Sequence, residues 1–275
     1  FGFRSAGREY VLRLGNYLPE YEKDRVMSAF AGPDLPVPEI IDVGEALNGV
    51  YAISVRAYGE ALDALDGATF RQTLPSILRM LDAMRVIDVS DTTGYGMWSP
   101  DGSAPFQTWR EFLLDVRNDR PDMRHHGWLE QLESQPAASA MFEEGYRQLE
   151  RLVEGCPEDR YLMHTDIVGD NVRVQNGRVS AVVDWANAMY GDFLYDLARL
   201  IFYQPWYPEM ESVAVGQMAR SHYESIGLAV PGFEQRLRAY QVHIGLDAQS
   251  YNAFTRRWDE VELAGRRTLE LARGS

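Results

Sequence analysis

The stretch His164-Thr165-Asp166-Ile167-Val168-Gly169-Asp170-Asn171, followed by Val183-Asp184-Trp185, decides the fold of this chain. Between the two motifs, 172–175 alternates polar and apolar residues as a strand does. Asn176-Gly177 is the strongest short signal for a hairpin turn, and 178–183 is the returning strand. A polar loop therefore runs into a hairpin whose far end carries an Asp.

The hairpin brings two polar residues of these motifs together. Pairing Gln175 with Arg178 sets Asn171 opposite Val182, one diagonal step from Asp184. Cross-strand diagonal neighbours lie roughly 7–8 Å apart. We therefore expect the side chains of Asn171 and Asp184 to reach one ion.

The order Asp166, Asn171, Asp184 is that of a kinase phosphoryl-transfer site, in which the first Asp orients the attacking hydroxyl and the other two residues hold Mg²⁺. Mg²⁺ takes few protein oxygens and completes its shell with phosphates and water, which suits one amide and one carboxylate. Thr165 replaces the Arg of protein kinases, and Asp184-Trp185-Ala186 replaces their D-F-G, which favours a small-molecule substrate. The alternative is a solvated loop before an ordinary hairpin, but that does not require these residues at this spacing.

Composition narrows the class of protein. The chain has 275 residues, 45% of them hydrophobic and 25% charged, which suits one large domain or two lobes. The net charge of -14 argues against nucleic acid as a partner and favours a cationic substrate. No apolar run approaches a membrane span, and no secretion signal opens the sequence. Cys156 is the only cysteine, which excludes an internal disulfide and predicts a cytoplasmic protein.

The pattern along the chain predicts an α+β protein, with a small antiparallel sheet lobe before a larger, mostly helical lobe. Strands are expected at 1–4, 9–14, 40–43 and 51–55, with a turn at Asn48-Gly49 and a helix at 18–30. Further helices are expected at 69–86, 109–116, 128–132, 138–153, 192–202, 209–226, 233–254 and 258–272. We assign 1–56 to a nucleotide lobe and 57–275 to a hinge and helical lobe with the catalytic loop and substrate site.

Residues of the first lobe and of the hinge that follows it are candidates for nucleotide binding. Arg13 stands where kinases carry a strand lysine, and a guanidinium can also hold phosphates. Its acidic partner is expected on the next helix, at Asp24 or, as second choice, Glu22. Backbone groups of Val55 to Ala57 are expected to contact adenine as the hinge. An exposed edge-strand Arg and a plain inter-lobe linker are the alternatives.

A second set of residues is expected to bind the substrate. Asp192 opens a helix, either as a simple N-cap or as a brace for the catalytic loop. Tyr203, Trp206 and Glu209 belong to an acidic, aromatic stretch, and carboxylates beside aromatic faces suit cationic sugars. Aromatic residues near helix ends are often core residues, which is the alternative reading of this stretch.

Together these residues resemble the aminoglycoside phosphotransferase family of kinase-like enzymes. The family pattern H-x-D-x-x-x-x-N, then I/V-D-W, then G-D-x-x-x-D stands here as His164 to Asn171, Val183 to Trp185, and Gly191 to Asp196. Similar segments span nearly the whole chain, at 10–13, 21–25, 35–39, 108–110, 181–185, 205–206, 237–240 and 244–247. The resemblance therefore implies a bilobal, protein-kinase-like fold.

The resemblance implies ATP-dependent O-phosphorylation of an aminoglycoside antibiotic, with Mg²⁺, and with GTP as a possible second nucleotide. It makes Asp166 the base, Asn171 and Asp184 the Mg²⁺ ligands and Arg13 the phosphate clamp, and it places Asp170 beside the sugar. Family members have a first strand and a nucleotide-covering loop ahead of the segment that begins here at Phe1. We therefore expect a small lobe that is truncated at its front.

Two other functions stay open at this point. One is a kinase for another small alcohol, such as a macrolide, choline or a sugar, although the acidic stretch 203–211 favours a cationic acceptor. The other is a catalytically inactive binding module, which intact Asp166, Asn171 and Asp184 argue against. In either case we expect a monomer that binds neither nucleic acid nor membranes.

Overall fold

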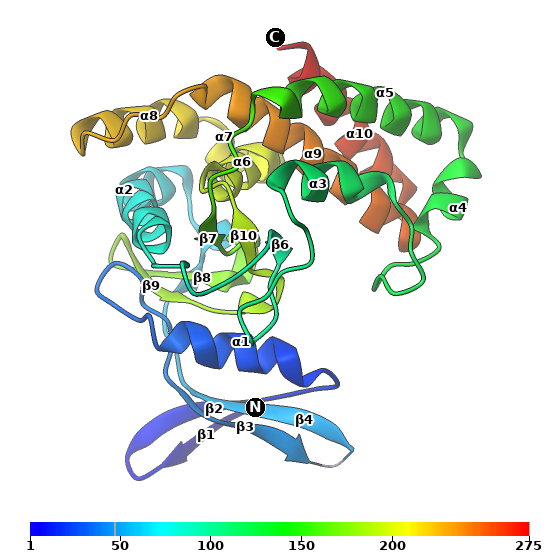
Figure 1. Cartoon of the computed structure of the whole chain (residues 1–275). Coiled ribbons are helices and arrows are strands. Elements are labelled where there is room, and N and C mark those ends of the chain that lie inside the picture. Colours follow the sequence, from blue (N-terminus) through cyan, green and yellow to red (C-terminus); the bar gives the residue numbers. More distant parts are fainter. Residues whose placement is uncertain (47, 275) are drawn as a thin grey trace.

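The computed structural model describes residues 1–46 and 48–274. Its first lobe is a four-stranded antiparallel sheet in the order β1-β2-β4-β3, and α1 lies between this sheet and the rest of the molecule (Figure 1). The bounds are β1 Gly2–Ser5, β2 Arg8–Gly15, α1 Leu18–Ser28, β3 Ile40–Ala46 and β4 Gly49–Val55. The predicted sheet lobe with one helix is confirmed.

Left-handed turn residues close both hairpins of this sheet. Ala6 and Gly7 have φ of 48° and 79° between β1 and β2, and Asn48 has φ of 61° before β4. Such values fit the tight turns that match the twist of paired strands. The inner face of β4 is buried at every second residue, as one covered sheet face requires. Position 47, at the second turn, lies outside the described residues.

The second lobe is mostly helical, as predicted. Its helices are α2 Gly67–Arg85, α3 Trp109–Leu114, α4 Trp128–Glu133, α5 Pro136–Leu152, α6 Leu194–Tyr203, α7 Pro208–Glu211, α8 Val215–Ser225, α9 Phe233–Phe254 and α10 Trp258–Arg273. Asp66 caps α2 by accepting the amide of Thr69 at 2.7 Å, so the helix begins slightly before the predicted residue. Within the described residues, no helix combines the length and the apolar character needed to cross a membrane.

The expected single helix over 209–226 is wrong, because the chain turns between α7 and α8. The buried amide of Gln204 donates to the carbonyls of Met210 and Val213, at 2.5 and 2.6 Å. These bonds hold the 210–213 backbone in a turn that a continuous helix could not form. The short α7 is therefore fixed beside α6.

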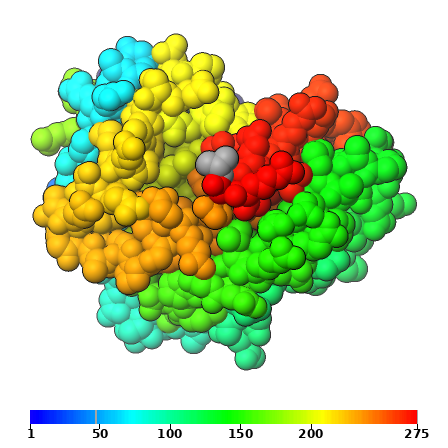
Figure 2. All heavy atoms as spheres, turned by 90° about the horizontal axis from the view of Figure 1, so that it is seen from above, coloured from blue at the N-terminus to red at the C-terminus, as the bar shows by residue number. Residues whose placement is uncertain are grey.

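The long helix α9 forms the centre of the helical layer. It packs against α4, α5, α6 and α10, and most of its residues are buried. Seen from above, α10 lies between α5 and the region of α8 and α9 (Figure 2). Helix α6 reaches from this layer toward the middle of the molecule, where the two motifs lie.

Short strands fill the space between α1 and the helical layer. One sheet has the order β5-β8-β9 and another the order β6-β10-β7. The bounds are β5 Glu60–Ala61, β6 Gly96–Met97, β7 Tyr161–Met163, β8 Val172–Gln175, β9 Arg178–Val182 and β10 Met189–Gly191. The catalytic loop follows β7, and Asp184 follows β9, so both motifs leave the strands in the same region (Figure 1).

The predicted register of the β8–β9 hairpin is wrong by one residue near its open end. Gln175 pairs with Arg178 as expected, but Val172 pairs with Val182. A bulge inserts Ser180 between the residues that pair with Arg173 and Val174, and one extra residue shifts every pair beyond it. Asn171 consequently bonds to Val183, whose amide donates to its carbonyl at 2.9 Å.

Candidate active site

The backbone of the catalytic loop is held by a buried carboxylate on α6. Asp196 accepts the amides of His164 and Thr165, at 2.9 and 2.6 Å. Thr165 has φ of 63°, a conformation that a β-branched residue adopts only under constraint from its surroundings. Burial raises the pKa of Asp196, and the two amides that it accepts and the charge of Arg199 oppose that rise.

His164 braces the loop from within. Its Nε2 lies 3.0 Å from the carbonyl of Val183, and its Nδ1 lies 3.2 Å from the amide nitrogen of Asp166. Because a carbonyl can only accept and an amide can only donate, the ring is a neutral imidazole protonated on Nε2. Both nitrogens are thus used in the fold, which agrees with a bracing role rather than proton transfer.

Asp166 presents a half-buried carboxylate between two groups. Asn171 Nδ2 donates to Asp166 Oδ2 at 3.0 Å and to its carbonyl at 2.9 Å. On the other side, Arg199 Nη2 lies 3.8 Å from Asp166 Oδ1. The amide nitrogen of Asn171 is used here, so its Oδ1 is the atom left to bind a cation.

Asp184 is exposed and directly follows Val183, whose amide bonds to the carbonyl of Asn171. Its φ of 63° turns the chain sharply after β9, so that Trp185 enters the core. The described residues contain no group of three His, Cys, Asp or Glu side chains able to hold a metal. One amide oxygen and one free carboxylate nevertheless fit Mg²⁺, which relies largely on phosphates and water.

Helix α1 connects the small lobe to the segment after Asp184. Arg13 pairs with Asp24, and the other Asp24 oxygen accepts the amide of Trp185 at 2.8 Å. Glu22, the second choice, pairs with Arg25 at 3.0 Å instead. The first choice of partner for Arg13 is therefore confirmed by the geometry.

The two predicted hinge residues differ in what they can offer a nucleotide. The amide of Val55 donates to the carbonyl of Glu39 at 2.9 Å, within the sheet. Ala57 lies beyond β4, and no hydrogen bond among the described residues uses its backbone. An adenine contact at Ala57 therefore remains a prediction, whereas the Val55 amide is already occupied.

Asp192 is not a substrate residue, which corrects the expectation for this position. It is fully buried, and its carboxylate binds Arg236 at 2.6 and 2.8 Å, Tyr240, and the amide of Leu194 at 3.1 Å. A carboxylate whose oxygens are already bonded inside the core cannot meet a ligand. Asp192 instead anchors the start of α6 to α9.

The other four predicted substrate residues lie at or near the surface. Asp170 is exposed and pairs with Arg173 at 3.0 Å. Tyr203 lies under Arg199, whose guanidinium carbon is 5.3 Å from its ring centre. Trp206 stacks on Phe202 and donates to Glu260 at 3.2 Å, so it is partly a packing residue.

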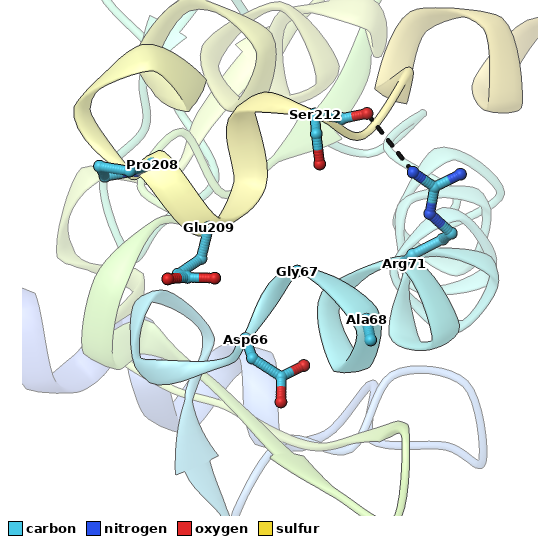
Figure 3. Close-up of a pocket in the computed structure, with 7 residues that line it drawn as sticks. All are labelled: Asp66, Gly67, Ala68, Arg71, Pro208, Glu209 and Ser212. Atoms are coloured by element: carbon cyan, nitrogen blue, oxygen red, sulfur yellow. Dashed lines mark hydrogen bonds between the residues drawn. The ribbon is translucent and has the colours of Figure 1, made fainter.

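Glu209 borders a surface pocket of about 470 Å³ between α2 and α7. Its side chain extends from α7 beside the start of α2, whereas the side chain of Asp66 turns away from it to cap α2, and Arg71 reaches Ser212 (Figure 3). Gly67 allows the close packing of the two helices, since a Cβ there would lie 2.4 Å from the carbonyl oxygen of Glu209. Glu209 is thus free to act on a ligand, and whether it does remains a prediction.

Two charged residues of the site were missed in the sequence. Arg199 follows Asp196 by less than one helical turn, so the helical period places both on the face of α6 that meets the loop. Lys23 precedes Asp24 and is buried, although lysine is almost never fully buried. Its position beside Asp24 is the only sequence signal, and that signal does not reveal the burial.

Comparison with known proteins agrees with this site. Residues 3–228 match the phosphotransferase enzyme family, abbreviated APH. The hygromycin-B 4-O-kinase of Escherichia coli is 36% identical over 249 residues, which are 90% of this chain and 69% of that protein.

Comparison with solved structures also finds aminoglycoside phosphotransferases. A thermostable mutant of aminoglycoside phosphotransferase APH(4)-Ia, in ternary complex with AMP-PNP and hygromycin B, is 32% identical with a TM-score of 0.85, covering 100% of this chain and 90% of that one. Spectinomycin phosphotransferase APH(9)-Ia shares the fold, at 14% identity and a TM-score of 0.59 over 99% of this chain and 88% of that one. The predicted bilobal, kinase-like fold is therefore confirmed. The chain belongs to the aminoglycoside phosphotransferases of the phosphotransferase enzyme family.

Proposed function

We propose that this protein transfers the γ-phosphoryl group of ATP to a hydroxyl of an aminoglycoside similar to hygromycin B, and so confers resistance to it. The observation that carries the proposal is the half-buried carboxylate of Asp166 between Asn171 and Arg199, with exposed Asp184 one residue beyond Val183, which bonds to Asn171. The relative from Escherichia coli is a hygromycin-B 4-O-kinase, and the APH(4)-Ia structure holds AMP-PNP and hygromycin B.

Asp166 would act as the base. The substrate oxygen forms its bond to the γ-phosphorus while the bond from that phosphorus to the ADP oxygen breaks, and the hydroxyl proton passes to the Asp166 carboxylate. Asn171 and Asp184 would hold Mg²⁺, which neutralises phosphate charge when bound. Arg13, fixed by Asp24, would hold the other phosphates, and Ala57 would meet the base of the nucleotide.

Acidic groups around the acceptor side support a cationic substrate. Asp63 approaches the catalytic loop, with Oδ2 3.7 Å from where a Cβ would stand on Gly169. Exposed Asp170 and Glu209 add to the net charge of -14. Carboxylates on one side of a cleft attract protonated amines through steering and local pairing. We propose Asp170, Tyr203, Trp206 and Glu209 as the residues nearest the aminoglycoside.

A coupled ADP-release assay tests the proposal directly. The purified protein would be given ATP, Mg²⁺ and one acceptor at a time, with hygromycin B, spectinomycin, a macrolide and choline as acceptors. We expect turnover with hygromycin B, and replacing ATP with GTP would establish the nucleotide. Turnover with choline or the macrolide, and with no aminoglycoside, would contradict the proposal.

We also propose a cytoplasmic monomer. An enzyme that consumes ATP must work where ATP is available, and the only cysteine, Cys156, is unpaired. Light scattering coupled to size-exclusion chromatography would measure the mass, and a dimer at micromolar concentration would contradict the monomer.

A further inference from the structure

Lys23 is the only lysine in the sequence, and it is buried in the joint between α1 and the segment that follows Asp184. Its side chain is almost inaccessible to solvent. The Nζ atom donates to the carbonyls of Ala186 and Ala188, at 2.7 and 3.0 Å. It also lies 4.8 Å from the ring centre of Trp98. No ion pair within the described residues includes Lys23, so this cation is bound by carbonyls and a π face.

The geometry suits an amine rather than a guanidinium. The three N–H donors of lysine radiate from one atom, and here two meet carbonyls while Trp98 offers the face of its ring. Arginine spreads its donors over a planar fork and could not bring them to one point between two carbonyls. Every other Lys or Arg position of the chain is arginine, so lysine stands only at this site.

The backbone that Lys23 holds is the backbone that sets the position of Asp184. Beyond Asp184, the amide of Trp185 is bound by Asp24 and the carbonyl of Asn187 by Thr165. Lys23 takes the carbonyl of Ala186 and shares that of Ala188 with the backbone amide of Trp98, which lies 3.4 Å from it. Every buried polar backbone group needs a partner, so without Lys23 this turn would lose the contacts that fix it against α1.

We propose that Lys23 is a positioning residue for Asp184, holding the turn that presents this carboxylate to the metal and phosphates. The inference rests on the proposed function for the role of Asp184. Lys23 acts from α1, the helix that also fixes Arg13 through Asp24. The small lobe therefore sets the phosphate clamp and the metal carboxylate together.

The environment also makes Lys23 sensitive to pH. Burial lowers the pKa of Lys23 to about 7, and the charges of Asp24 and Glu20 oppose that shift. Both acids come from α1 itself, and Arg124 lies 3.9 Å from Glu20. Across from α1 the amine meets Trp98 and the backbone carbonyls. A neutral amine still donates to both carbonyls but loses the charge that strengthens these bonds.

Equilibrium binding of AMP-PNP tests the proposal, since it needs no acceptor. Titrations at several Mg²⁺ concentrations would compare the wild type, Lys23→Met, Lys23→Arg and the control Arg25→Met, which alters an exposed residue of the same helix. We expect Lys23→Met to raise the Mg²⁺ concentration needed for half-maximal binding about tenfold, with Arg25→Met unchanged. Lys23→Arg should not restore binding, because the fork misplaces its donors.

Equal Mg²⁺ dependence in the wild type and Lys23→Met would overturn the proposal, and so would full recovery with Lys23→Arg. Hygromycin B turnover provides a second readout, in which Lys23→Met should raise the KM for MgATP while the KM for hygromycin B stays within about twofold. If the wild type binds MgAMP-PNP but phosphorylates no aminoglycoside, the proposed substrate fails while the role of Lys23 is still tested.

A spectroscopic measurement tests the site without nucleotide. Because the chain has one lysine, biosynthetic ¹⁵N-lysine gives a single Nζ resonance. We expect it to titrate near neutral pH, with slowly exchanging protons that report the carbonyl contacts. A midpoint at the ordinary value for a free lysine would show that the amine is solvated and would overturn the proposal even where a variant fails to fold.

Discussion

Two helices hold the two catalytic segments with the same kind of contact. On α6, Asp196 accepts the amides of His164 and Thr165. On α1, Asp24 accepts the amide of Trp185, the residue after Asp184. Each segment contains a non-glycine residue with φ of 63°, Thr165 in one and Asp184 in the other. Strained backbone of this kind persists only where neighbouring groups determine it.

The two helices differ in how deeply they are embedded. Seven of the ten residues of α6 are buried, against three of the eleven in α1. The loop of Asp166 is therefore part of the large core, whereas the turn after Asp184 depends on a few polar contacts from the small lobe. Changes at the α6 contact should reduce stability, and changes at the α1 contact should weaken nucleotide and metal binding.

The largest effect is expected at Asp166, which lies in the loop that Asp196 of α6 holds. Asp166→Asn keeps the size of the side chain but removes the proton acceptor, so kcat should fall about 10³-fold, as loss of a general base typically causes. The KM for hygromycin B should change by less than about threefold, because the side chain still occupies its place. Steady-state kinetics would measure both, and a near-normal kcat would remove Asp166 from the base role.

Removing the α6 contact itself should be the most damaging change for folding. Asp196→Ala leaves two buried amides without acceptors, at a cost of about 3 kcal/mol in the free energy of unfolding. Asp170→Ala alters a residue of the same loop that is exposed and whose ion pair, in the part of the chain that the structure describes, is with Arg173. It should change the free energy of unfolding by less than about 1 kcal/mol. Urea unfolding would measure both, and equal losses would contradict the distinction between core and surface contacts.

This comparison also shows how far the sequence leads. The motif spacing and the Asn176-Gly177 turn predicted a hairpin that brings Asn171 close to the Asp184 segment, and Asn171 indeed bonds to Val183, because hairpin pairing is local. The exact register could not be predicted, since the bulge at Ser180 has no distinctive residue pattern. The burial of Asp192 and Lys23 depends on partners far along the chain, namely Arg236 and Tyr240 for Asp192 and the carbonyls of Ala186 and Ala188 for Lys23.

The contact of Lys23, on α1, with the turn after Asp184 should make the free energy of unfolding depend on pH. The pKa of Lys23 is lowered from 10.5 to about 7 by burial. Between these values the unfolded chain holds a proton that the folded chain has released, so Lys23 makes stability rise with pH in this window. From pH 7 to 9 the wild type should gain about 2 kcal/mol relative to Lys23→Met. Unfolding curves at several pH values would measure the difference, and parallel pH profiles would contradict it.

The smallest effect is expected on the KM for MgATP, where Asp24 and Glu22 of α1 should differ. Asp24 binds both Arg13 and the Trp185 amide, so Asp24→Ala should free the phosphate clamp and loosen the turn after Asp184. Losing a charged hydrogen bond of this kind corresponds to about a tenfold rise in the KM for MgATP. Glu22→Ala is the matched control, because among the described residues the ion pair of Glu22 is with the exposed Arg25, and the change should leave this KM unaltered. Kinetics with varied MgATP would decide, and an equal rise in both variants would mean that α1 acts through its general charge rather than through the contact of Asp24.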